Sequence, residues 1–293
     1  MKNKSNTGQI ILHIMFVIIS LCFIIPFIYM ISISLSDEQS LILHGYSLIP
    51  KKFSLEAYNL VFKNSKQILM SYQATTIYSI ISTILAIVVM SMFAYPLSRS
   101  TYKHKNALSL YVLITMLFNA GMVPNYLLIT KYLHLDNTIW VYIFPGLVSA
   151  WNLIIIRTNF NNIPVSLIES AKLDGASEGY ICFKIVIPLS LPTLAAIAFL
   201  FLVPKWNDWY TTLLYVREPS LYSLQYVLQR ILREADFAKQ MVELGQEYVD
   251  TSQIPTESFK YAIALIVAGP MLIIFPFFQK FFVKGMTVGA IKG

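Results

Sequence analysis

Residues 161–188 read NNIPVSLIESAKLDGASEGYICFKIVIP and carry the most specific pattern in the chain. Pro164 suits the first turn of a helix, where its missing N–H has no intrahelical partner. Gly175 can end that helix in a left-handed cap. Small and apolar side chains fall on one face at helical spacing: Leu167, Ile168, Ala171 and Gly175. The segment predicts a short helix, either an amphipathic helix at the membrane surface or a docking helix for a partner protein.

Apolar stretches on both sides of this segment are long enough to cross a lipid bilayer. A spanning helix needs about 20 apolar residues for a hydrocarbon core of roughly 30 Å. The composition agrees, because 56% of the residues are hydrophobic and 13% are charged, against roughly 25% charged in an average soluble chain. We therefore expect an all-α integral membrane protein, which excludes a soluble enzyme, a disordered regulator and a nucleic-acid binder. Six transmembrane helices are expected at residues 10–35, 72–97, 107–129, 139–156, 186–203 and 259–283.

Six spans place both chain termini on the same side of the membrane. The short connection 99–106 and the tail 280–293 are basic, and positive charge in short segments marks the cytoplasmic side. Both termini and the loop 161–185 are therefore expected in the cytoplasm, and the long loop 204–258 outside, where a loop of that length usually carries function. Since no repeat or linker divides the chain, residues 1–293 form one predicted transmembrane domain.

Motifs for catalysis and for ion coupling are missing from the sequence. It has no G-x-x-x-x-G-K-[ST] phosphate loop, its four histidines are isolated and its two cysteines lie far apart. The mid-span positions lack the Asp, Glu or His that a proton- or sodium-coupled carrier uses. We therefore expect no enzymatic activity, no cofactor or metal bound by this chain, and an energy source outside it.

The segment 161–188 resembles the signature of the membrane subunits of ATP-binding-cassette (ABC) importers. That signature is Glu-Ala-Ala, three residues, Gly, nine residues, then Ile-x-Leu-Pro. The chain has Glu169-Ser170-Ala171, three residues, Gly175, nine residues, then Ile185-Val186-Ile187-Pro188, with Ser170 for Ala and Ile187 for Leu. Further stretches fit the carbohydrate branch of maltose-importer type, and most of all the branch associated with aldouronate and complex oligosaccharide uptake: 53–58, 121–126, 174–176, 188–192, 206–209 and 284–293.

The resemblance implies a type I ABC importer permease fold, a bacterial cytoplasmic membrane and ATP-driven oligosaccharide uptake. The implied partners are a second permease subunit in a heterodimer, an ABC ATPase dimer, an extracellular solute-binding protein and the oligosaccharide. ATP and Mg would be bound by the ATPases, which dock on the short helix. The resemblance assigns ATPase docking to seven residues: Glu169, Ser170, Ala171, Asp174, Gly175, Ile185 and Pro188.

Aromatic and amide side chains are candidates for the substrate pathway, because sugars are usually held by aromatic faces and by polar groups at their hydroxyls. The outer end of the fifth predicted span offers Trp206, Asn207, Trp209 and Tyr210. Trp and Tyr are also enriched at membrane interfaces, and the sequence favours this belt over a sugar contact. Asn119 and Asn152 lie in apolar spans, where an amide contacts substrate or bonds a neighbouring helix.

Two alternative functions stay open at this point. A secondary, ion-coupled carrier would need a coupling-ion site within the membrane. An ABC importer permease for a non-sugar solute, such as an amino acid or a metal, would need charged or thiolate groups facing its cavity. The predicted spans show neither feature.

Overall fold

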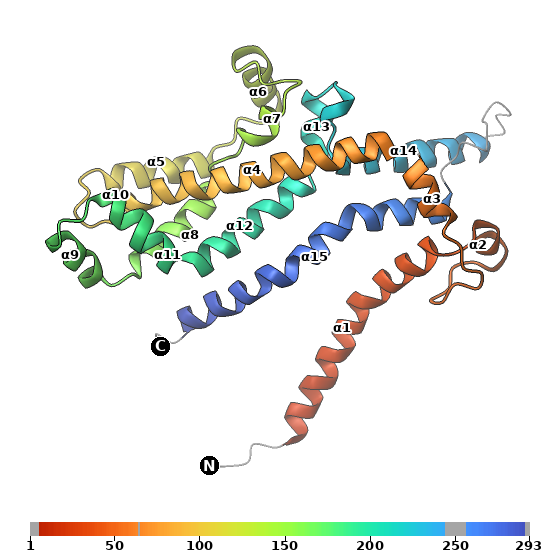
Figure 1. Ribbon diagram of the computed structural model, residues 1–293, viewed down its shortest axis with the longest axis horizontal. Helices are drawn as coiled ribbons and strands as arrows, with labels where there is room; N and C mark the ends of the chain where they lie inside the picture. The colour runs from red at the N-terminus through yellow and green to blue at the C-terminus, as the bar shows by residue number, and fades with distance from the viewer. Residues whose placement is uncertain (1–5, 64, 244–255, 291–293) are drawn as a thin grey trace. The chain divides into compact units, whose positions relative to one another are not determined.

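The chain is helical in the computed structural model, which describes residues 6–63, 65–243 and 256–290 (Figure 1). The predicted all-α class is therefore confirmed. An isolated antiparallel bridge pairs Ser36 with Phe53. In chain order the elements are α1 (Asn6–Ser34), α2 (Glu38–His44), α3 (Glu56–Lys63), α4 (Ser65–Ser98), α5 (Lys105–Leu117), α6 (Met122–Leu127), the π-helix η1 (Leu128–Tyr132), α7 (Trp140–Ile143), α8 (Ala150–Asn161), α9 (Val165–Leu173), α10 (Glu178–Tyr180), the π-helix η2 (Ile181–Val186), α11 (Ile187–Leu189), α12 (Leu191–Trp206), α13 (Tyr210–Tyr215), the 3₁₀-helix η3 (Pro219–Leu221), α14 (Leu224–Glu243) and α15 (Glu257–Ala290).

The chain divides into two compact units. The first comprises Met1–Lys66 and Leu228–Pro270, and the second comprises Gln67–Val227 and Met271–Gly293. Each unit therefore joins segments that lie far apart in the sequence. Both groups of predicted site residues belong to the second unit.

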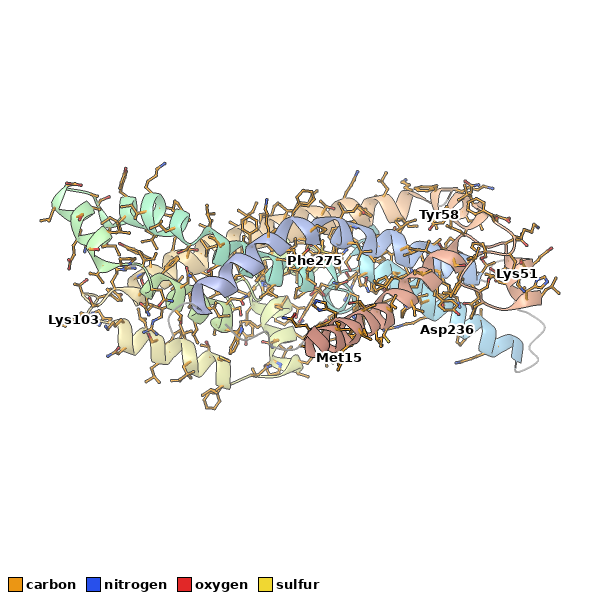
Figure 2. All side chains as sticks on the ribbon, turned by 90° about the horizontal axis from the view of Figure 1, so that it is seen from below. Met15, Lys51, Tyr58, Lys103, Asp236 and Phe275 are labelled. Atoms are coloured by element: carbon orange, nitrogen blue, oxygen red, sulfur yellow. The ribbon has the colours of Figure 1, made fainter. Side chains whose placement is uncertain are left out.

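Continuous helices cover three of the predicted spans. Within the described ranges, three helices are long and apolar enough to cross a membrane: Gly8–Ser34, Lys66–Ser98 and Glu257–Phe281. They contain most or all of the predicted spans 10–35, 72–97 and 259–283. The apolar side chains of α1 are exposed over most of its length, as Figure 2 shows around Met15, and Ile33 near its end is buried. A helix that is apolar all round suits a lipid environment.

Two other predicted spans are bent helix pairs. Lys105–Leu117 and Met122–Tyr132 meet at 111°, and Glu178–Leu189 and Leu191–Trp206 meet at 79°. The first bend lies at Gly121, whose φ of +86° is readily adopted only by glycine. These pairs contain the predicted spans 107–129 and 186–203, so the structure replaces two straight helices with two broken ones.

The predicted fourth span, 139–156, contains Pro145-Gly146, and the structure forms two separate helices there. α7 ends at Ile143 and α8 begins at Ala150. Gly146 has a φ of +72° in the connection. Ser149 caps α8, since its hydroxyl accepts the Asn152 N–H at 3.4 Å. The Pro145-Gly146 pair thus ends one helix, and Ser149 starts another.

The bend in the fifth predicted span follows from its prolines. Pro188 has no N–H to donate to the preceding turn. The turn before it is wound as the π-helix η2, and the Ile187 N–H bonds the Cys182 carbonyl five residues back. Pro192 then lies in the first turn of α12, where a missing N–H is tolerated. π-Turns often occur at functional sites, and this one directly follows the ABC-importer-like segment.

An apolar core in the second unit packs α4 against α8, η2 and α12, and Figure 1 shows α8 and α12 running beside α4. Met90 of α4, Ile156 and Phe160 of α8, and Ile181 of η2 are fully buried there. Ile168 of α9 belongs to the same cluster and is only 4% exposed. The short helix is therefore anchored to the spanning helices.

Tyr142 organises a second cluster in this unit. Its ring stacks on Tyr78 at 4.2 Å between centroids. Its hydroxyl lies 2.7 Å from Thr212 Oγ1 and donates to the Leu221 carbonyl at 2.9 Å. Thr75 Oγ1 accepts the Leu224 N–H at 2.8 Å. The ring stack joins α7 to α4, and the hydrogen bonds join α13 to α7 and the start of α14 to α4.

Glu38 joins two distant segments of the first unit. Its carboxylate accepts the Glu257 N–H at 3.0 Å, the Ser258 N–H at 3.0 Å and the Ser258 hydroxyl at 2.9 Å. The first N–H groups of a helix have no intrahelical partner, and the helix dipole favours an anion there. Glu38 of α2 therefore caps α15.

We predict that Glu38→Ala destabilises the protein by about 1–3 kcal/mol, because two backbone donors at the start of α15 lose a charged acceptor. The measurement is the free energy of unfolding of the purified protein in detergent. Glu56→Ala is the matched control, since Glu56 is an exposed carboxylate in the first turn of α3. Equal losses in the two variants would contradict the capping role.

Candidate functional site

The short helix predicted after Pro164 is α9. Its first residue, Val165, follows Pro164 directly, and its end forms a Schellman motif. Gly175 has a φ of +82° and donates to the Lys172 carbonyl at 3.0 Å, while the Ala176 N–H donates to the Ala171 carbonyl at 2.9 Å. A Cβ at position 175 would meet no atom within 4 Å, so the backbone conformation alone demands glycine. The predicted left-handed cap is confirmed.

The two sides of α9 have different surroundings. Ile168 is buried, and Ala171 is half-buried against the same apolar core. The opposite side is exposed, and its Leu173 side chain is 89% exposed. Among the residues assigned to docking, Glu169, Ser170, Asp174 and Gly175 are exposed. Ala171 thus faces the protein's own core. The exposed side carries Leu173, which the sequence pattern did not single out.

The last two residues assigned to docking lie beyond α9. Ile185 is half-buried in η2 against the apolar core, and Pro188 is exposed in α11. An open cavity of 530 Å³ lies between α9 and η2, and its lining includes Ala171, Gly175 and Ile185. Four of the seven residues assigned to docking therefore line one concave surface: Ala171, Asp174, Gly175 and Ile185.

A chain of polar contacts ties the end of α9 to α4. Lys172 Nζ lies 2.5 Å from Glu178 Oε1, and the Tyr95 hydroxyl donates to Glu178 Oε2 at 2.5 Å. The Arg99 guanidinium lies 5.0 Å from the centre of the Tyr95 ring. Tyr95 is 7% exposed, whereas Lys172 and Glu178 are much more open to solvent. The sequence analysis missed this contact, because nothing in the spacing relates residue 95 to residue 178.

The aromatic candidates at the end of α12 separate into buried and exposed groups. Trp206 is 4% exposed and meets the Tyr72 ring edge-on at 5.7 Å. Asn207 is exposed and donates through Nδ2 to the Val203 carbonyl at 2.9 Å. Trp209 is half-buried, and Tyr210 is 45% exposed, with its hydroxyl directed to Met122 Sδ at 2.8 Å. Trp209 and Tyr210 are therefore the accessible members.

The two span asparagines lie in different settings. Asn119 is in the break between α5 and α6, where its Oδ1 accepts the Gly121 N–H at 2.9 Å. This is a local turn contact, which stabilises the bend. Asn152 is half-buried in the first turn of α8 and lines an open cavity of 390 Å³ together with residues of α12. Of the two, Asn152 faces space that a ligand can enter.

Lys205 is the residue near this cavity that the sequence analysis did not find. The fifth span was predicted to end at residue 203, which placed Lys205 in the outer loop. The structure continues α12 to Trp206, and the ammonium of Lys205 donates to the Tyr142 carbonyl at 2.5 Å and the Pro145 carbonyl at 3.2 Å. A lysine at the very edge of an apolar stretch was the available signal, since ionisable groups at membrane depth are usually functional.

No three His, Cys, Asp or Glu side chains within the described ranges lie close enough together to hold a metal ion. The sites described are instead an exposed short helix beside a concave surface, and a polar cavity between two apolar helices.

Comparison with known proteins gives the family. Residues 5–288 match the family described as the inner membrane component of binding-protein-dependent transport systems, and the chain belongs to it. The chain is therefore a multi-pass permease subunit of an ABC importer, as the signature at 169–188 predicted, and the alternative of an ion-coupled carrier is not supported.

Two relatives in Bacillus subtilis (strain 168) are named as sugar permeases. The polygalacturonan/rhamnogalacturonan transport system permease protein YtcP is 35% identical over 294 residues, covering 99% of this chain and 100% of its own length. The arabinooligosaccharides transport system permease protein AraQ is 28% identical over 289 residues, covering 97% of this chain and 96% of its own.

A solved structure resembles the fold closely. It is the crystal structure of a bacterial ABC transporter involved in the import of the acidic polysaccharide alginate. One of its chains gives a TM-score of 0.82 at 26% sequence identity, covering 96% of this chain and 99% of that chain. The predicted type I permease fold is confirmed by this match.

We predict that Tyr95→Phe lowers ATP-driven transport by the assembled importer about three- to tenfold, because a charge-assisted hydrogen bond between α4 and the end of α9 is lost. Lys172→Met should cost less, since an exposed ion pair contributes little. The measurement is the uptake rate in proteoliposomes. Tyr102→Phe, in the α4–α5 connection, is the control, and wild-type uptake by Tyr95→Phe would contradict the coupling role.

Proposed function

We propose that this chain is one of two permease subunits of an ATP-driven importer for oligosaccharides in a bacterial inner membrane. The observation that carries the proposal is α9, whose signature residues are spaced as in ABC importers and whose glycine cap has the required geometry. The names of the relatives, which transport polygalacturonan, rhamnogalacturonan or arabinooligosaccharides, support a sugar substrate.

The α9 helix is the proposed docking element for an ABC ATPase. Its exposed side offers the Glu169 carboxylate and the Leu173 side chain, and the 530 Å³ cavity beside Gly175 offers a concave surface. Because Ile168 and Ala171 pack on the apolar core, a pull on α9 is passed directly to α4, α8 and η2. ATP and Mg are held by the ATPase dimer, and this chain contributes no hydrolytic chemistry.

The partners follow from this role. A second permease subunit completes the passage as a heterodimer, two ATPases bind in the cytoplasm, and an extracellular solute-binding protein delivers the oligosaccharide. With α9 in the cytoplasm, six spans put both termini there as well. Trp209 and Tyr210 are the proposed aromatic sugar contacts, with Asn152 further along the passage, whereas Trp206 packs against Tyr72.

Uptake by the reconstituted complex tests the function. Proteoliposomes that contain both permeases and the ATPases should take up oligosaccharide only when ATP is on the side of the membrane that carries the ATPases. The solute-binding protein must be added on the opposite side. A proton or sodium gradient alone should give no uptake. Gradient-driven uptake without ATP would overturn the proposal in favour of an ion-coupled carrier.

We predict that Gly175→Arg abolishes uptake while the protein still inserts into the membrane. The side chain would project from the docking surface, and a residue other than glycine at a φ of +82° is strained by about 1–2 kcal/mol. Gly45→Arg is a matched control, because Gly45 has a φ of +71° and equally open surroundings in the first unit. Uptake should survive in that variant. Normal uptake by Gly175→Arg, or equal loss in both variants, would contradict docking through α9.

A further inference from the structure

Two arginine side chains bond the ends of α4 and α8 reciprocally. Arg157 lies near the end of α8, and its Nε donates to the Leu97 carbonyl of α4 at 3.1 Å. Arg99 directly follows α4, and its Nη2 donates to the Phe160 carbonyl of α8 at 3.3 Å. Each of the two segments therefore supplies a guanidinium group to the end of the other helix.

Both acceptors are carbonyls that lack a partner within their own helix. Leu97 and Phe160 lie in the last turns of α4 and α8, where the last four C=O groups find no intrahelical N–H. An arginine near a helix C-terminus can bond such carbonyls, and its charge is favourable beside the negative end of the helix dipole. The two arginines thus act as exchanged caps.

The two helices run in the same direction, which adds to the value of these caps. Tyr142, before α8, stacks on Tyr78 in the first half of α4, whereas Phe160 at the end of α8 meets Arg99 beyond the end of α4. Figure 1 shows α8 beside α4. Parallel neighbouring helices place their negative dipole ends side by side, where like partial charges repel. Two guanidinium groups at these ends offset that repulsion.

Neither guanidinium group forms an ion pair among the residues that the structure describes. Both side chains are half-buried, and Arg99 also donates through Nε to Ser98 Oγ at 3.0 Å. The Glu178 carboxylate is bonded by Lys172 and Tyr95 instead. Ionisable side chains near membrane depth pair with one another or with backbone carbonyls, and they usually serve a function. Here the carbonyl contacts join two helices.

A movement of α9 reaches α8 first. Residues 162–164 connect α8 to α9, and Ile168 of α9 is buried in the same core as Phe160. The apolar packing between α8 and α4 is non-directional, so it resists separation of the helices more than sliding of one along the other. Hydrogen bonds require a narrow range of distances and angles, so they oppose sliding. The arginine contacts therefore set the register in which α4 follows α8.

We propose that Arg99 and Arg157 are positioning residues, which lock α4 and α8 in one register so that both helices follow α9 as one body. We call this pair the arginine clasp. The inference rests on the proposed docking of an ATPase at α9 and goes beyond it by naming the contacts that pass the movement from α8 to α4. Both bonds are needed, because a single bond still allows one helix to pivot about it.

The distance between α4 and α8 tests the arginine clasp in the assembled importer with its second permease subunit, ATPases and binding protein. Nitroxide labels are attached at Phe93→Cys on α4 and Thr158→Cys on α8, two exposed positions, in a Cys22→Ser background. Double electron–electron resonance gives the label distances with and without the non-hydrolysable nucleotide AMP-PNP. An intact clasp should give a narrow distribution that nucleotide leaves unchanged, and a nucleotide-dependent change in it would overturn the locked register.

With AMP-PNP bound, Arg157→Met should raise the fraction of molecules outside the wild-type distance range about tenfold, the equilibrium effect of one lost hydrogen bond to a charged group. Arg99→Met should act alike, and the double variant should add little. Lys103→Met is the matched control, because Lys103 is an exposed lysine in the same α4–α5 connection (Figure 2). Wild-type distances in both Met variants, or effects that multiply in the double variant, would overturn the clasp.

Conservative variants separate positioning from damage to the fold. Arg157→Lys and Arg99→Lys keep a cationic donor at the helix ends, so each should restore most of the wild-type distribution. A change in distance that is equal with and without nucleotide would show altered packing alone and overturn the coupling role. Failure of an ABC ATPase to assemble with the wild-type chain would instead overturn the proposed function, so the two failures are distinguishable.

Discussion

Every backbone N–H and C=O at membrane depth needs a hydrogen-bond partner, because hydrocarbon offers none, and this constraint shapes the rest of the structure. The long helices α1, α4 and α15 satisfy it internally. Where the chain breaks, the freed groups are met by nearby side chains and turns. Lys205 bonds two carbonyls at the break between α7 and α8, and Asn119 accepts an N–H at the break between α5 and α6. Breaks are therefore places where side chains supply hydrogen bonds that the helical backbone does not make.

Much of the fold was predictable from hydrophobic length and proline position. The stretches 10–35, 72–97 and 259–283 are predominantly apolar and form continuous helices, because a helix pairs most of its own backbone polar groups. The angles of the bends at 107–129 and 186–203 could not be predicted from the sequence. Gly121 and Pro188 signal a break, but the angle depends on the packing of the neighbouring helices. At 139–156 the Pro145-Gly146 pair signals a break in the same way, and the stretch forms two helices.

The candidate site was predictable where the pattern is local. Pro164 and Gly175 bracket α9 as the spacing indicated, since capping depends on a few adjacent residues. The contacts that matter between helices were not predictable. Tyr95 meets Glu178, and Lys205 meets Tyr142, only because separate helices pack together. Trp206 was a candidate sugar contact because it is aromatic. In the structure it packs against Tyr72 instead.

The bond between Glu38 and Ser258 spans 220 positions of the chain. A ribosome synthesises and inserts the segment around Glu38 long before the start of α15 exists. During that interval the carboxylate has no helix end to cap, and α1 lies in the bilayer with its apolar side chains against lipid. The first unit can therefore assemble only late in biogenesis, after α15 has been synthesised and can contact the segment around Glu38.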